Sequence, residues 1–242
     1  MNTEVKPTDE THGYHFTESK QHHGATIHRV VYANGVQGGW VEGAHNLADN
    51  ARVLDEAIVC GKATVTRDAT VSGQAFVSGH AQVTSNAKVA GNATVSGHAF
   101  IGGYADISSH ASISNYAWIA GHARVHGNVV VSGHANISED AHIADHARIT
   151  RHAAVSGLVA ISGHALITGY ARVDGMAIIT DSAQVSGYAR ISDHATVHGN
   201  AKVSGYAQVN HNGQVAGYAT VGGESIITDE MVFTPSSTPN VV

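Results

Sequence analysis

The chain has 242 residues, of which 13 are Lys or Arg and 19 are Asp or Glu, so its formal net charge is −6. An acidic balance without a basic block argues against nucleic acid or an anionic membrane surface as a partner. The first residues are polar and no run of about 18 apolar residues occurs, so we expect no signal peptide and no transmembrane segment. We therefore expect a cytoplasmic chain. The single cysteine, Cys60, excludes an internal disulfide.

A segment of distinct composition precedes the rest of the chain, and we place its boundary at residue 44. Residues 1–24 carry few apolar side chains, and we expect them to be mobile. The run IHRVVYA at residues 27–33 is strand-like. It is followed by a motif rich in glycine, which consists of Gly38, Gly39, Trp40 and Glu42. Residues 1–44 are thus predicted to close one end of the structure that follows.

The dominant signal is a repeat with a period of six residues. Alanine recurs in one frame from Ala51 to Ala219, and the frame is broken only at Val129, Val159 and Gly213. A valine or isoleucine follows two positions after each of these small residues, which gives the unit A-x-[VI]-[ST]-G-x. Self-similarity of this kind, without insertions, is typical of solenoid proteins.

Each repeat unit predicts one short strand followed by a corner. Alternation points the alanine and the aliphatic residue to one side of the strand and the residue between them to the other. Glycine, Asn, Asp or His then supplies the corner, because these residues tolerate left-handed backbone conformations best. One such strand cannot bury its apolar side alone, so successive units must wind and stack. The fold is predicted to be an all-β, single-stranded parallel β-helix with three sides, about 18 residues per turn and about ten turns.

We expect this solenoid to span residues 45–230. The repeat frame decays after Ile227, and residues 231–242 are predicted to form a plug and a loose tail. Met231, Val232 and Phe233 are the residues expected to plug the last turn.

The repeat resembles the left-handed hexapeptide-repeat β-helix family, in which a small residue stands two positions before each aliphatic one. The resemblance covers residues 45–228 and implies a left-handed coil and a homotrimer. The hand comes from the resemblance alone, because the general crossover rule favours the opposite hand. The motif at Gly38, Gly39, Trp40 and Glu42 resembles the opening motif of a bacterial and phage group of β-helix proteins, which are often called acyltransferases by analogy. This second resemblance implies that the segment is a cap, and that the chain is cytoplasmic or part of a phage or bacterial particle.

With three repeat units in each turn, one edge of the prism collects aromatic rings on successive turns. The position before alanine in this column holds His80, His98, Tyr116, His134, His152, Tyr170, Tyr188 and Tyr206. Trp118 lies two residues after Tyr116 and adds exposed apolar area. The rings are close enough to stack, which would fix the register between turns. Alternatively, the column is a contact surface for a neighbouring subunit or for a sugar.

An enzymatic role is the alternative interpretation. Acyltransferases of the resembled family use a histidine as general base in a groove between subunits and take acetyl-CoA or another acyl-CoA. The present repeat extrudes no loop to wall such a groove, and its edge histidines stand one residue later than expected. Only His211 occupies the earlier slot, so we assign no catalytic residue and, outside this alternative, no cofactor.

Two histidine pairs raise the question of a metal site. GHARVHG contains His122 and His126, and DHATVHG contains His194 and His198. The γ-class carbonic anhydrases place metal-binding histidines on this fold, across a trimer interface. A catalytic zinc ion needs three protein ligands, and each pair supplies only two.

The sequence therefore favours a non-catalytic structural or binding solenoid. We expect a homo-oligomer, with a trimer favoured, that acts as a rod or as a spike-, fibre- or adaptor-like component of a larger assembly. A larger protein assembly and a carbohydrate are the partners that the ring column suggests.

Overall fold

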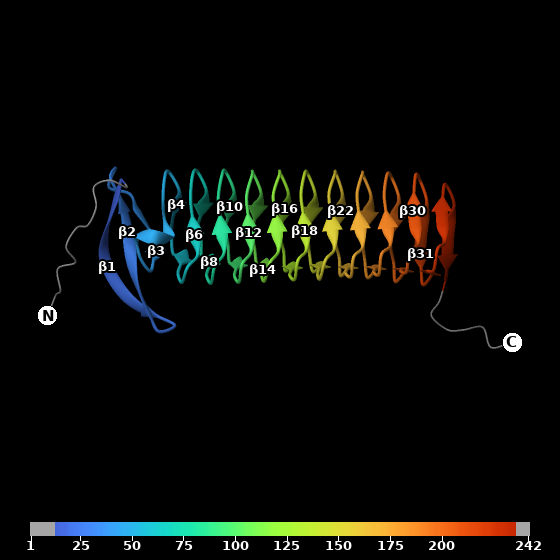
Figure 1. The fold of residues 1–242 in the computed structure, drawn as a ribbon, viewed down its shortest axis with the longest axis horizontal. Helices are drawn as coiled ribbons and strands as arrows, with labels where there is room; N and C mark the ends of the chain where they lie inside the picture. Colours follow the sequence, from blue (N-terminus) through green and yellow to red (C-terminus); the bar gives the residue numbers. More distant parts are fainter. Residues whose placement is uncertain (1–12, 236–242) are drawn as a thin grey trace. The chain divides into compact units, whose positions relative to one another are not determined.

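The structure, a computed structural model, describes residues 13–235, which fall into two compact units, residues 13–115 and residues 116–235. In both units short parallel strands wind into a three-sided β-solenoid (Figure 1). Counted over both units, the winding makes about 11 turns of roughly 18 residues, which confirms the predicted all-β solenoid. The left hand of the coil stays an expectation from the resemblance. Parts of the predicted N-terminal segment and C-terminal tail, residues 1–12 and 236–242, lie outside the described residues.

The first unit begins with an antiparallel cap. Strands β1 (Tyr14–His22), β2 (Ala25–Tyr32) and β3 (Gln37–Val41) pair in this order. The 3₁₀ turn η2 (Ala44–Asn46) follows, and no helical segment within residues 13–235 has the length and hydropathy that crossing a bilayer requires. Strand β1 corrects the expectation that residues 1–24 are mobile, as far as residues 13–24 are concerned. Its turn residues His23 and Gly24 both have positive φ angles (47° and 85°), the conformation of a two-residue hairpin turn.

The cap joins the solenoid through β3, whose residues Trp40 and Val41 pair in parallel with Ile58 and Val59, one turn later. Trp40 is 5% exposed, and its Nε1–H donates a hydrogen bond to Glu56 Oε2 at 2.9 Å. The Arg29 guanidinium lies 4.2 Å from the centroid of the same ring and donates to Glu56 Oε1 at 2.7 Å. Cation, ring and carboxylate therefore hold β2, β3 and the first turn together.

The other motif residues of the predicted cap have equally specific contacts. A Cβ atom on Gly39 would lie 2.5 Å from the Ala57 carbonyl oxygen, and one on Gly38 would lie 2.6 Å from the Val53 oxygen, so only glycine fits at both positions. Glu42 Oε2 accepts the Gly61 N–H at 2.6 Å. Asn46 is fully buried, and its amide donates to Ala63 O at 2.8 Å, so this buried polar side chain is paired.

After the cap, the strands of the first unit are two residues long. They form three parallel sheets in the orders β3-β5-β8-β11-β14, β4-β7-β10-β13 and β6-β9-β12. Their bounds are β4 (Arg52–Val53), β5 (Ile58–Val59), β6 (Thr64–Val65), β7 (Thr70–Val71), β8 (Phe76–Val77), β9 (Gln82–Val83), β10 (Lys88–Val89), β11 (Thr94–Val95), β12 (Phe100–Ile101), β13 (Asp106–Ile107) and β14 (Ser112–Ile113).

The second unit repeats this plan. We call its three sheets sheet A (β17-β20-β23-β26-β29-β32), sheet B (β15-β18-β21-β24-β27-β30-β33) and sheet C (β16-β19-β22-β25-β28-β31-β34). The strand bounds are β15 (Trp118–Ile119), β16 (Arg124–Val125), β17 (Val130–Val131), β18 (Asn136–Ile137), β19 (His142–Ile143), β20 (Arg148–Ile149), β21 (Ala154–Val155), β22 (Ala160–Ile161), β23 (Leu166–Ile167), β24 (Arg172–Val173), β25 (Ile178–Ile179), β26 (Gln184–Val185), β27 (Arg190–Ile191), β28 (Thr196–Val197), β29 (Lys202–Val203), β30 (Gln208–Asn210), β31 (Gln214–Gly217), β32 (Thr220–Val221), β33 (Ile226–Thr228) and β34 (Met231–Thr234).

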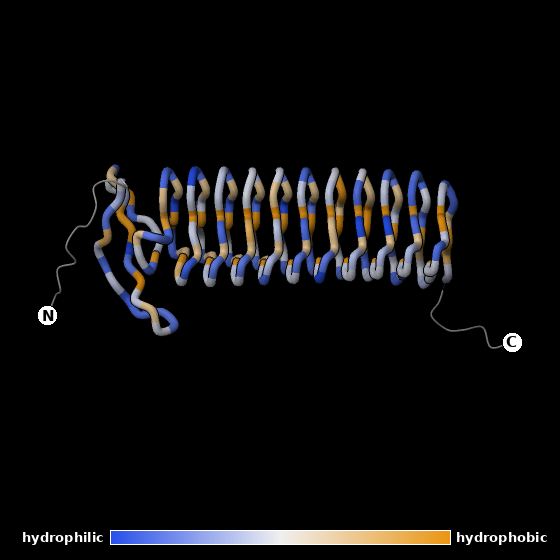
Figure 2. The backbone as a smooth tube through the Cα atoms, viewed as in Figure 1, coloured by the Kyte–Doolittle hydropathy of each residue, from blue (hydrophilic) through white to orange (hydrophobic). Residues whose placement is uncertain are grey.

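The predicted core is confirmed inside each unit. Alanine and the aliphatic residue two positions later are both buried, as Ala171 and Val173 illustrate (0% and 1% exposed). Figure 2 shows apolar residues recurring at each strand between polar corners. The core is narrow, because every strand contributes one methyl group and one branched side chain to it.

The corners have the predicted left-handed conformation, since their first residue has a positive φ angle. Most of them hold the predicted residue types, but five corners hold Ser, Arg or Glu instead: Arg67, Ser85, Ser109, Glu139 and Arg151. At Gly157 (φ 91°) an added Cβ would lie 2.4 Å from the Gly175 oxygen. Aspartate replaces glycine at several corners, and its carboxylate then accepts the N–H of the corresponding residue one turn later. These pairs are Asp49 with Arg67, Asp55 with Gly73, Asp145 with Gly163, Asp181 with Gly199, and Asp193 with His211.

The last turn of the second unit departs from the strict repeat. Pairing keeps the register of the repeat up to Asn210 opposite Thr228. Strands β31 and β34 are one residue closer in sequence, with Gln214 opposite Met231. Val232 is half-buried, whereas Met231 and Phe233 are 61% and 58% exposed. The segment therefore extends sheet C by one strand, and two of the three residues predicted to plug the core face outward.

Candidate interaction surface

The rings of the second unit form one row along the edge between sheets A and B. We call these residues the ring stripe: Tyr116, His134, His152, Tyr170, Tyr188 and Tyr206. Each is the second corner residue of its turn and directly precedes a buried alanine. The backbone fixes their spacing, because the N–H of each ring residue donates to the carbonyl of the corner residue one turn later, as from Tyr170 to Gly187 O at 2.7 Å.

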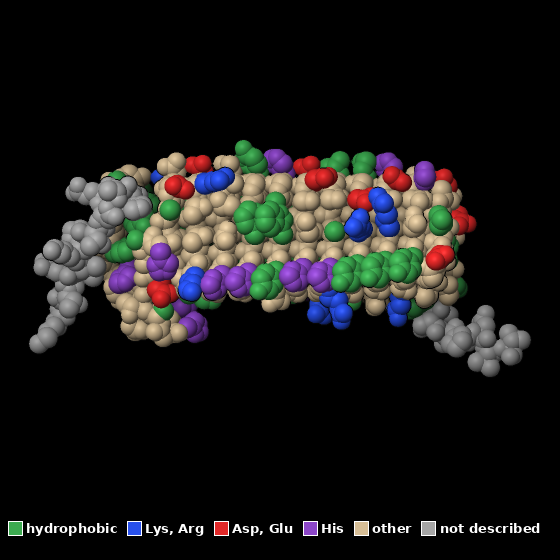
Figure 3. Space-filling view, viewed as in Figure 1, with side chains coloured by type: hydrophobic (Ala, Val, Ile, Leu, Met, Phe, Trp, Pro, Cys, Tyr) green, Lys and Arg blue, Asp and Glu red, His purple; other side chains and the backbone are tan. Residues whose placement is uncertain are grey.

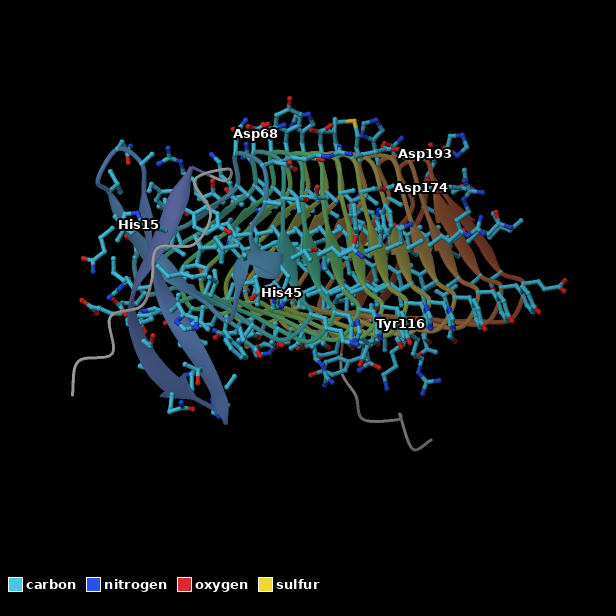
Figure 4. All side chains as sticks on the ribbon, turned by 60° about the vertical axis from the view of Figure 1, so that its left-hand side comes forward. His15, His45, Asp68, Tyr116, Asp174 and Asp193 are labelled. Carbon is cyan, nitrogen blue, oxygen red and sulfur yellow. The ribbon has the colours of Figure 1, made fainter. Side chains whose placement is uncertain are left out.

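Consecutive rings of the stripe are stacked face to face. Their centroids lie 4.8–5.1 Å apart and their planes differ by 2–6°. The tyrosines of the stripe are 50–61% exposed. Figure 3 shows the stripe as a row of green and purple side chains, and Figure 4 labels its first member, Tyr116. Since the rings between the two ends have neighbours on both faces, they present their edges and polar atoms to the outside.

The two remaining rings of the predicted column, His80 and His98, belong to the first unit. Their centroids are 4.6 Å apart with an interplanar angle of 15°, so they stack as well. Trp118 is the outward residue of β15 on sheet B and is 47% exposed. The neighbouring column contributes a shorter stack, His146 on His164, with centroids 4.8 Å apart.

Two arginines flank the ring stripe on sheet B. Arg172 and Arg190 occupy paired positions on β24 and β27, and both are exposed. Arg190 Nη2 lies 3.2 Å from Asp174 Oδ2. Together with His152, Tyr170, Tyr188 and Tyr206, they line a shallow groove of about 460 Å³. Two positive charges on paired positions of neighbouring strands repel each other. Negative groups beside them relieve this repulsion, so this flank of the stripe is suited to bind negative groups.

A second exposed feature lies on the same turns, at the edge between sheets B and C. We call it the apolar patch: Leu158, Ala160, Met176 and Ile178. Leu158, Met176 and Ile178 are 59%, 48% and 44% exposed. Ala160 and Ile178 are direct partners on β22 and β25. Sorting the sequence into columns already places Leu158 above Met176, but the patch appears only when the edge and sheet columns are considered together.

The histidines proposed as metal ligands are arranged differently from the sequence pairs. His126 Nε2 lies 2.6 Å from the Nε2 atom of His142 on β19, a residue that the sequence did not single out. The backbone N–H groups of His194 and His198 donate to the backbone carbonyls of His211 and Val215, respectively, in the following turn. Within residues 13–235 no group of three or more His, Cys, Asp or Glu side chains is placed to hold a metal ion.

His211, the histidine in the slot expected of some acyltransferases, stands at a corner with a φ angle of 50°. Its side chain is 64% exposed, and its Nδ1 atom lies 4.0 Å from Asp193 Oδ2. The ring also lies within hydrogen-bond distance of Asn210 Oδ1, at 3.2 Å. These neighbours are the ordinary polar contacts of an exposed corner residue.

Comparison with known proteins supports the repeat. A family model described as YdcK Beta solenoid repeat matches residues 189–205, which include β27, β28 and β29. A search among curated proteins finds no match. The chain is thus similar to a β-solenoid repeat family over one turn of the second unit.

Proposed function

We propose that this chain is a non-catalytic β-solenoid that associates with copies of itself along the ring stripe and serves as a component of a larger assembly. The observation that carries the proposal is the stacking of five consecutive ring pairs on one exposed edge, at centroid distances of 4.8–5.1 Å. This spacing is close to the distance between neighbouring strands of a β-sheet, about 4.7–4.9 Å. A second solenoid laid parallel to the first therefore meets every ring at the same position of its own repeat.

The geometry of the stripe favours a protein over a sugar as its partner. Sugars bind aromatic residues best through the face of the ring. Between the two ends of the stripe both faces of each ring are covered by neighbouring rings, with interplanar angles of 2–6°. Tyrosine and histidine edges offer both apolar area and hydrogen-bonding atoms at low entropic cost, as protein interfaces require.

The proposal is tested by the mass of the protein in solution. Sedimentation velocity across a micromolar concentration series is expected to show a trimer, with three times the 25.0 kDa chain mass. A monomer at every concentration would contradict self-association.

The acyltransferase alternative is tested in parallel. We expect saturating acetyl-CoA to leave the melting temperature unchanged, because only a ligand that binds the folded state raises it. A rise that depends on the acetyl-CoA concentration would contradict a non-catalytic role and favour the alternative.

A further inference from the structure

We infer that the surface that receives the ring stripe is the apolar patch of a second copy, so that the contact joins two different edges of the solenoid. This inference rests on the proposed function and adds the identity of the partner surface. Each copy then uses its ring stripe to bind one neighbour and its apolar patch to bind another. Such head-to-tail contacts form a closed ring when the rotation between neighbouring copies divides a full circle.

The apolar patch is the first part of the argument. In Leu158, Met176 and Ile178, about half of each side chain is in contact with water, although the outward positions of a solenoid are normally small or polar. In a single copy, the exposed half of this apolar surface stays in contact with water. Clustered on two consecutive turns of one edge, they mark a surface that another molecule covers.

The height of the two surfaces along the solenoid is the second part. Within the second unit, Leu158 follows six residues after His152, and Met176 follows six residues after Tyr170. If two copies are related by rotation about an axis parallel to the solenoid, corresponding turns lie at the same height along that axis in both copies. The patch of one copy then meets the part of the ring stripe formed by His152, Tyr170 and Tyr188 on its neighbour.

Charge is the third part. The stripe is flanked by the exposed Arg172 and Arg190 at the level of the patch. Two exposed aspartates lie on the edge that carries the patch. Asp140 is at the position of Leu158 in the preceding turn, and Asp193 is at the position of Gly175, the neighbour of Met176, in the following turn. Figure 4 labels Asp193. A basic flank on one surface and acidic residues around the other orient two copies and speed their encounter.

The test uses one double variant for each surface. Leu158→Glu with Met176→Glu alters the patch, and Tyr170→Glu with Tyr188→Glu alters the stripe. All four side chains are exposed, so each variant is expected to keep the fold, which circular dichroism and thermal unfolding verify. As a matched control, Ser182→Glu with Asn200→Glu adds the same charge to the third edge of the same turns.

Each surface variant alone is expected to dissociate, because charge is placed inside the contact. The protein concentration at which half of the oligomer is dissociated should rise at least tenfold. The control variant should keep the mass of the natural chain. The decisive sample is a mixture of the two surface variants. One has an intact stripe and the other an intact patch, so the mixture should form a complex of one copy of each.

The outcomes separate this inference from the proposed function. If the patch variant stays as oligomeric as the natural chain, the patch is not the partner surface, although self-association through the stripe stands. If both variants dissociate but their mixture stays monomeric, the pairing of unlike edges is wrong. A natural chain that is itself monomeric overturns the proposed function and this inference together.

Discussion

His126 and His142 are joined by an Nε2–Nε2 distance of 2.6 Å across two consecutive turns of the second unit. One nitrogen must donate and the other must accept, so the contact requires that at least one ring lack a proton on Nε2. Burial, the charge of His126 and that of Arg124 lower the pKa of His142 below 6.5, and Asp145 opposes them. His142 therefore binds a proton less readily in the folded chain than in the unfolded chain.

The sign of the pH effect follows from this direction. When the folded pKa of a histidine lies below its unfolded value, the unfolded chain takes up the proton first, and the free energy of unfolding falls as the pH drops through the unfolded pKa. We expect the melting temperature to decrease between pH 7.5 and pH 5.5, and His142→Gln to reduce that decrease by a few degrees. Thermal unfolding at both pH values measures it. His110→Gln, at an exposed corner of the first unit, serves as control, and an equal effect of both substitutions would contradict the assignment.

Most of the fold could be predicted from the sequence because one period determines it. The recurrence of alanine and of valine or isoleucine in one frame defines the strand, its buried side and its partner one turn later. The observed pairing of Val155 with Val173, 18 residues later, has this register. The stacking within the ring stripe follows from the same register. The corner conformation was predictable as well, since glycine or aspartate occupies most of the first corner positions.

What the sequence did not reveal involves contacts outside the columns. His126 contacts His142, and Asp174 contacts Arg190, across different columns of the repeat, so sorting the sequence by turns separates the members of both pairs. Strand β1 is mostly exposed, and backbone pairing with β2 holds it, so its composition gives little signal. The His23–Gly24 pair was the available clue, because these residue types tolerate the positive φ angles of a two-residue hairpin turn, which both adopt.

The cap is expected to depend on Trp40. Replacing it with alanine removes a buried ring together with its hydrogen bond to Glu56 and its contact with Arg29, and large aromatic truncations cost about 3–5 kcal/mol. Hydrogen exchange is expected to quicken in β1, β2 and β3 while the second unit stays protected. Trp40→Phe, which keeps the ring but loses the donor, should have a smaller effect. Unchanged protection in the alanine variant would show that backbone pairing alone holds the cap.

Glu56 makes the same region sensitive to acid. Its hydrogen bonds from Trp40 and then from Arg29 hold the pKa of its carboxyl below 4.5. A lowered folded pKa means that its contribution is present above pH 4.5 and disappears as the pH falls through the folded value. Relative to the intrinsic amide exchange rate at each pH, exchange in β1–β3 is therefore expected to rise in acid in the natural chain. In Glu56→Gln it should already be raised at pH 7 and should change less in acid, and parallel pH profiles of the two proteins would contradict the role of the carboxylate.

The corner at Asp181 separates backbone strain from hydrogen bonding. Its φ angle is 58°, and its Oδ2 atom accepts the Gly199 N–H at 2.8 Å. Asp181→Ala keeps the strain and loses the acceptor, so it should destabilise by about 1–2 kcal/mol. Asp181→Gly, which relieves the strain, should cost less, and Asp181→Asn, which keeps an oxygen acceptor, should cost least. Urea denaturation gives the order, with Asp174→Ala, which removes an exposed ion pair, as control.

The ring stripe is expected to matter more for association than for folding. Ile167 is fully buried, and Ile167→Ala should cost about 2–5 kcal/mol of unfolding free energy. Tyr170 is half-exposed and stacks on two rings, so Tyr170→Ala should cost about 1 kcal/mol or less, and Tyr170→His, which keeps a stacking ring, almost nothing. Denaturation at a protein concentration where the chain is monomeric measures all three. If Tyr170→Ala proved as costly as Ile167→Ala, the stripe would be a brace between turns, and its exposed edge would no longer indicate a partner.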